Sequence, residues 1–155
     1  MKTNGLRIVD REEKVIVVRL FDILEEIREG NSLSWSILEI SGVGYYDIGQ
    51  SYTDLVNKVK KSKTGLVVSW NELNEISRNF EQIIWLSLIG CKDNNNLHHY
   101  KSDKEMYETC DIVIEMIDSC YWEVFSKDVQ LLARLASKFK NVKVLESDFQ
   151  QDKKE

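Results

Sequence analysis

The stretch of residues 65–90 constrains the fold most, because it holds the densest apolar material in the chain. Ser69 and Glu72 have the spacing of a capping box, which marks the first turn of a helix. Apolar residues then recur at helical spacing, and the later run at 83–89 is too short to span a membrane. We therefore predict a strand, a helix and a central strand covered on both faces, with Trp85 in the core.

Elements on either side of this stretch complete the prediction. Alternating or periodic apolar residues indicate strands near 6–9, 34–40, 112–118, 121–125 and 142–145, and helices over 14–29, 51–62, 102–109 and 127–140. The β-branched start of the first helix, at 15–18, could also form a strand. Only a short polar turn separates 112–118 from 121–125, which predicts an antiparallel hairpin. The mixed order favours an α+β fold, with helices packed on a mixed, mainly antiparallel sheet.

Length and composition indicate one folded domain. A chain of 155 residues with 43% hydrophobic and 30% charged residues can bury a core without stabilising disulfides or metal ions. We expect a single domain over 1–148 and a polar, frayed tail over 149–155. Three cysteines make a disulfide framework unfavourable, so we expect reduced thiols and a cytoplasmic protein. No stretch has the ~18 apolar residues of a membrane helix.

The net charge of −5 narrows the class of partner. An acidic surface repels phosphate backbones, which argues against general nucleic-acid binding, and it suits a basic protein partner. Phosphate-binding, nucleophile-elbow and paired-cysteine motifs are absent, and we expect neither a cofactor nor a metal. Cys91, His98, His99 and Cys110 could be drawn as a zinc site, but their spacing matches no usual ligand pattern.

Two groups of residues are candidates for partner binding. Glu115, Asp118 and Glu123 lie on or beside the predicted hairpin, where charged side chains would point to the open face of a half-buried sheet. We expect them to form an exposed negative patch that tolerates replacement by lysine. A glycine-flanked loop adds a possible second contact, because loop tyrosines are common at interface hot spots: Tyr45, Tyr46 and Asp47.

Four stretches carry a family resemblance: WSILEI at 35–40, TGLVVSWNEL at 64–73, QIIW at 82–85 and YWEVFSKD at 121–128. In these the chain resembles small acidic immunity proteins encoded beside bacterial polymorphic or contact-dependent toxins. The resemblance implies a non-enzymatic protein that binds and neutralises a co-encoded toxin, and it transfers no site residue. The alternative is a small enzyme or regulatory domain that uses carboxylates with His98 or His99.

Overall fold

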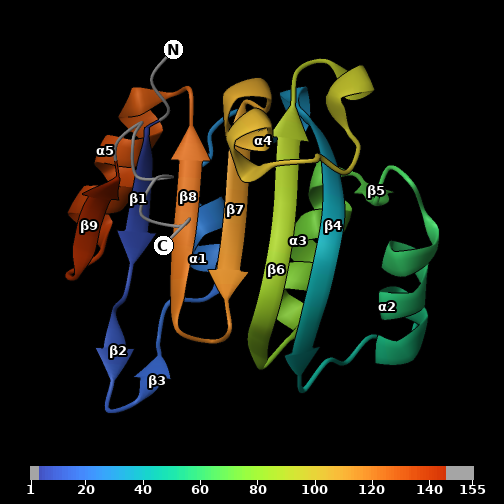
Figure 1. Ribbon diagram of the computed structural model, residues 1–155. Coiled ribbons are helices and arrows are strands. Elements are labelled where there is room, and N and C mark those ends of the chain that lie inside the picture. The colour runs from blue at the N-terminus through green and yellow to red at the C-terminus, as the bar shows by residue number, and fades with distance from the viewer. Residues whose placement is uncertain (1–3, 146–155) are drawn as a thin grey trace.

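A seven-stranded antiparallel sheet, in the order β5-β4-β6-β7-β8-β1-β9, forms the centre of the computed structural model, which describes residues 4–145 (Figure 1). The sheet strands are β1 (Gly5–Ile8), β4 (Ser34–Val43), β5 (Leu66–Val68), β6 (Gln82–Cys91), β7 (Ile112–Ile117), β8 (Tyr121–Ser126) and β9 (Val142–Leu145). A small separate hairpin pairs β2 (Arg11–Glu12) with β3 (Val15–Ile16). The helices are α1 (Leu20–Leu24), α2 (Tyr52–Lys61), α3 (Trp70–Asn79), α4 (Asp103–Thr109) and α5 (Val129–Lys138), with short 3-10 turns η1 (Gly30–Ser32) and η2 (Asn94–Asn96). The predicted α+β class is confirmed.

The central prediction, strand-helix-strand over 65–90, is confirmed as β5, α3 and β6. The capping box is formed: the Ser69 hydroxyl accepts from the Glu72 amide at 3.1 Å, and the Ser69 amide donates to the Glu72 carboxylate at 3.0 Å. β4 lies between β5 and β6 and pairs with both in antiparallel register. β5 and β6 therefore run parallel to each other without touching, which fits their connection through a helix.

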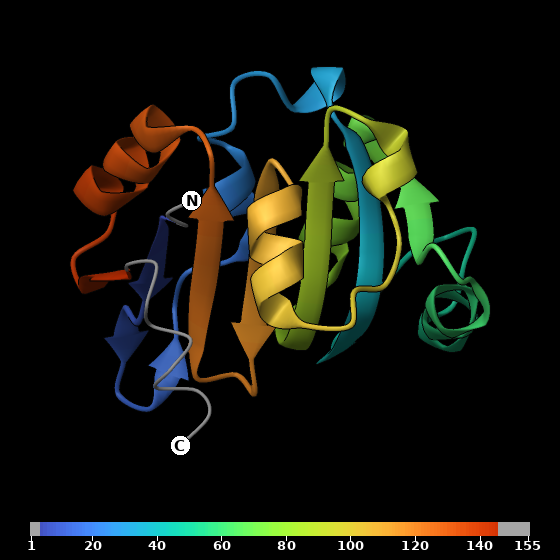
Figure 2. The same cartoon turned by 45° about the horizontal axis from the view of Figure 1, so that its top comes forward.

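The two faces of the sheet are covered unequally. Helices α1, α3 and α5 pack on one face over the main core, in which Trp35, Ile37 and Leu88 are fully buried. On the opposite face, α4 and the segment before it cover only one end of the sheet, above Val113 and Phe125 (Figure 2). α2 stands at the edge of the sheet beside β4 (Figure 1). The helices of residues 4–145 thus leave part of one sheet face uncovered.

The predicted helix over 14–29 is wrong. Its β-branched start forms β3 instead, in agreement with the low helix propensity of such residues, and only α1 remains helical. α1 ends after Leu24, and two side chains of α5 bind carbonyl oxygens near this end: Lys138 donates to the Asp22 backbone oxygen and Arg134 to the Glu26 backbone oxygen, both at 2.8 Å. Gly30, the residue after the predicted helix, lies against the Trp70 ring, which leaves no room for a Cβ atom at this position.

Boundaries at the C-terminal end shift by a residue or two. The hairpin of β7 and β8 forms as predicted, but its turn residues are Asp118 and Ser119, with φ of 47° and 60°. Positive φ at both central positions is a feature of type I′ turns, and the Cys120 amide donates to the Ile117 oxygen at 2.7 Å. The register pairs Ile117 with Tyr121, so the loop between the strands has three residues. The helix predicted over 127–140 is α5 and is two residues shorter at each end; Asp128 is its N-cap, and the Asp128 carboxylate accepts from two amides of the first turn. The tail predicted at 149–155 lies outside the described residues.

No helix within residues 4–145 is both long and apolar enough to cross a membrane.

Candidate functional site

A row of polar residues crosses the incompletely covered face of the sheet, with one residue from each of six adjacent strands. Direct cross-strand partners point to the same face, so the register aligns these side chains. The polar row consists, from β9 to β4, of Lys143, Arg7, Glu123, Glu115, Ser87 and Glu39. It is cationic at one end and acidic at the other, which gives this face of the sheet a charge gradient.

The cationic end of the polar row is closed by an ion pair. The Arg7 Nε and Nη2 atoms both donate to the Glu123 Oε2 atom, at 2.9 and 2.8 Å. Glu123 is 0% exposed, whereas the Arg7 side chain is 29% exposed and its guanidinium lies 4.4 Å from the centre of the Tyr121 ring. This ion pair joins β1 to β8 and gives the buried Glu123 carboxylate a cationic partner.

Glu115, directly opposite Glu123 in the register, is held by α4. The Tyr107 hydroxyl donates to the Glu115 Oε1 atom at 2.6 Å, and the Tyr107 ring stacks on Phe125 at 3.8 Å. Burial raises the pKa of Tyr107, and the nearby Glu115 carboxylate raises it further. The phenol therefore stays protonated and serves as a fixed hydrogen-bond donor that positions Glu115.

Beyond Glu115, the polar row opens into a groove of about 730 Å³ between α2 and α4, floored by β4 and β6. Three carboxylates line it, those of Glu39, Asp103 and Glu115, against one lysine, Lys60. The remaining lining residues are polar, aromatic or apolar: Leu38, Ile40, Ser41, Tyr52, Val56, Val59, Ser87, His99, Tyr100 and Met106. The groove thus combines an acidic rim with aromatic rings, a chemistry that suits a cationic side chain.

The hairpin patch expected from Glu115, Asp118 and Glu123 does not form as an exposed surface. Glu115 lines the groove and Asp118 is exposed in the turn, but Glu123 is buried under its ion pair. The expected exposure is therefore wrong for Glu123, and a lysine there would place a second cation beside Arg7 at a position that is 0% exposed. Alternation in the strand could not show this, since the open face is partly covered.

The residues of the candidate loop follow the C-terminal end of β4. Tyr45 is half-buried and packs on Phe80 with ring centres 4.7 Å apart, so it is largely structural. Tyr46 is 73% exposed and Asp47 is also exposed. The turn between β7 and β8, which carries Asp118, lies at the same end of the strands (Figure 1). The structure therefore leaves Tyr46, Asp47 and Asp118 available to a partner, and their role in binding stays a prediction.

The histidines and the two buried cysteines lie in different surroundings. The His98 ring packs at a tilt against the Tyr100 ring, and its Nδ1 atom lies 2.8 Å from the His99 carbonyl oxygen, while His99 lines the groove. Cys91 and Cys110 are buried beneath α4. A hydrogen bond to Cys110 and burial raise the pKa of the Cys91 thiol. Within residues 4–145, no group of three or more His, Cys, Asp or Glu side chains is placed to hold a metal ion.

Several residues of this site were missed from the sequence: Arg7, Glu39, Ser87, Asp103 and Tyr107. Each is an ordinary polar residue in its own segment, and only the strand register and the position of α4 bring them together. The one local signal was the capping position of Ser102, which accepts from the Glu105 amide and so fixes the start of α4 beside the groove.

Comparisons with known proteins give a family match that covers the site. A family described as "Protein of unknown function (DUF2691)" matches residues 8–155. No curated protein matches the chain, and no solved structure matches it. The match includes every groove-lining residue, so the site belongs to the part of the chain that the family covers.

Proposed function

We propose, for a chain that belongs to the DUF2691 family of proteins of unknown function, a role as a non-enzymatic binding protein that holds a basic segment of a protein partner in the groove between α2 and α4. The observation that carries this proposal is the set of three carboxylates around one groove, those of Glu39, Asp103 and Glu115. The net charge of −5 supports it, because a negative molecule attracts a basic partner from a distance.

The groove has the size and chemistry that such a ligand needs. Its volume of about 730 Å³ is large enough for a long side chain with its neighbours. Glu115 is held by Tyr107 and so presents a carboxylate in a fixed position, whereas Glu39 and Asp103 are exposed and can adjust. An arginine can pair with carboxylates through several N–H groups and also stack on the rings of Tyr52 or Tyr100.

We further propose that the partner is a co-encoded bacterial toxin domain, as the resemblance to immunity proteins implies. Many proteins that act on nucleic acids are basic, and an acidic inhibitor associates with them rapidly. A large secreted-toxin gene immediately upstream would support this partner, whereas an isolated metabolic operon would oppose it.

The test removes the charge of two groove carboxylates and compares this variant with one that loses two charges elsewhere on the surface. The groove variant is Glu39→Gln with Asp103→Asn, and the control variant is Glu12→Gln with Glu75→Gln; all four residues are exposed, and each pair removes two negative charges. Association of each purified protein with the neighbouring toxin domain is measured at low and high salt, and growth is scored on co-expression.

We expect the groove variant to associate more slowly, to dissociate faster and to lose protection, while the control variant loses only part of the salt-dependent association rate. If both variants behave alike, net charge and not the groove governs binding. If both bind as the wild type does, the groove is not the interface.

The second candidate is an enzyme, and one observation favours it: His99, Asp103 and Glu115 line the same groove. Stoichiometry separates the two functions. A binding protein protects cells or neutralises a toxin only at about one equivalent or more, whereas an enzyme acts far below one equivalent. Neutralisation curves with purified toxin domain at decreasing ratios therefore decide between them.

A further inference from the structure

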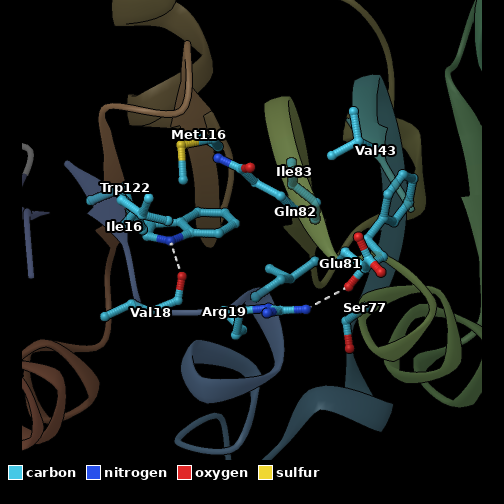
Figure 3. Close-up of a pocket in the computed structure, with 13 residues that line it drawn as sticks. Ile16, Val18, Arg19, Val43, Ser77, Glu81, Gln82, Ile83, Met116 and Trp122 are labelled. Atoms are coloured by element: carbon cyan, nitrogen blue, oxygen red, sulfur yellow. Dashed lines mark hydrogen bonds between the residues drawn. The ribbon is translucent and has the colours of Figure 1, made fainter. Parts of the chain in front are cut away.

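A second cavity lies apart from the groove and shares no lining residue with it. It has a volume of about 240 Å³ and is enclosed by β3, the start of α1, the end of α3 and strands β4, β6, β7 and β8 (Figure 3). Its walls are mostly apolar, with the Trp122 ring at one side and Met116 and Ile83 beside it. The Trp122 indole N–H donates to the Val18 oxygen at 2.9 Å, which fixes the ring as a wall.

Among residues 4–145, one cationic side chain lines this cavity. The half-buried Arg19 side chain lines it and donates from Nη2 to the Phe80 oxygen at 2.7 Å (Figure 3). Among the described residues, no carboxylate comes within 4.0 Å of the Arg19 guanidinium, in contrast to Arg7 and Lys138. Glu81 also lines the cavity but is exposed, and the remaining polar groups are the Gln82 amide and the Ser77 hydroxyl.

We infer that this cavity binds a small carboxylate with an apolar body. A guanidinium presents several N–H groups in a plane and pairs well with a carboxylate, above all where apolar walls exclude water. The apolar body would contact Trp122, Met116 and Ile83. The volume lies below the 300–1,000 Å³ typical of drug-sized ligands, so the ligand is about the size of a single substituted ring.

The test uses three probes of one shape and different charge: benzoate, benzyl alcohol and benzylamine. Each is titrated into the full-length protein while the indole N–H resonances are followed by NMR. Trp122 lines the cavity, whereas Trp35, whose indole N–H donates to the Gly30 oxygen at 2.7 Å, lies outside it and serves as an internal control. A ligand this small binds with a Kd on the order of millimolar.

We expect benzoate to shift the Trp122 resonance and not that of Trp35, benzyl alcohol to bind more weakly, and benzylamine to bind least. Arg19→Gln should weaken benzoate binding roughly ten- to 100-fold, the usual effect of losing a charge-assisted hydrogen bond. Arg78→Gln removes the same charge from an exposed position on α3 outside the cavity and should leave binding unchanged.

A third variant tests the cavity independently, in case Arg19→Gln does not fold. Val43 is 48% exposed and lines the cavity, so Val43→Trp should narrow it and weaken all three probes without disturbing the core. The inference is overturned if benzylamine binds as well as benzoate, if no probe shifts Trp122 at millimolar concentration, or if folded Arg19→Gln and Val43→Trp both bind benzoate as the wild type does.

Discussion

At the scale of single residues, burial separates tryptophans that look alike in the sequence. Trp85 was expected in the core, but its side chain points to the open face of β6 and is 38% exposed. Trp35 is 0% exposed, stacks on Trp70 at 5.3 Å and donates to the Gly30 oxygen. Trp35→Ala should therefore cost about 3–5 kcal/mol and Trp85→Ala less than about 2 kcal/mol. Denaturant unfolding of both variants measures this order; a larger loss for Trp85→Ala would contradict the placement of β6.

The ion pair of Arg7 and Glu123 makes a second residue-scale prediction, which is asymmetric. Removing Arg7 leaves a negative charge in a site that is 0% exposed, whereas removing the Glu123 charge leaves a cation that is 29% exposed and can be hydrated. Arg7→Met should therefore destabilise by about 3 kcal/mol or more, and Glu123→Gln by less. Glu123→Lys should prevent folding. Equal stability of the three variants in chemical unfolding would show that the pair is not buried.

At the scale of elements, α4 matters because Tyr107 connects it to β7. The pKa of Tyr107 is raised above its usual 10.0 by burial and by the adjacent Glu115 carboxylate. Above pH 10 the folded state therefore holds a proton that the unfolded state loses, and stability falls as the pH rises. Tyr107→Phe should lower stability at pH 7 by about 1.5–3 kcal/mol, through loss of the hydrogen bond, and should flatten the alkaline decline.

Unfolding curves between pH 7 and 11 measure both effects. Tyr46→Phe is the control, because its ring is 73% exposed and makes no comparable contact with Glu115. An alkaline decline that is as steep in Tyr107→Phe as in the wild type would mean that this residue does not link α4 to the pH response.

At the scale of the whole molecule, the described residues form an apolar core on one sheet face and a smaller cluster under α4, and residues 4–145 contain no group of three or more His, Cys, Asp or Glu side chains that could hold a metal ion. We predict that purified protein carries no stoichiometric zinc and that a chelator leaves its melting temperature unchanged. One zinc per chain by elemental analysis would contradict this prediction and would support a zinc site formed by Cys91, His98, His99 and Cys110.

The local part of the fold was predictable because its physics is local. The capping pair of Ser69 and Glu72, the periodic face of α3 and the short turn between β7 and β8 each depend on residues a few positions apart. These signals were sufficient for the α+β class and for the order of most elements. They failed at 14–29, where the carbonyls near the end of α1 accept hydrogen bonds from Lys138 and Arg134, on a helix more than 100 residues later.

The sequence by itself thus determined the fold class, the central strand-helix-strand unit, the hairpin and the acidic character of the molecule. Only the tertiary structure decided that Glu123 is buried, that Trp85 is half outside the core, and that Glu39, Asp103 and Glu115 share a groove. The physical reason is that a strand sequence shows which residues alternate but not which strand lies beside it or which part of a face a helix covers. The register of six strands and the position of α4 supply that information.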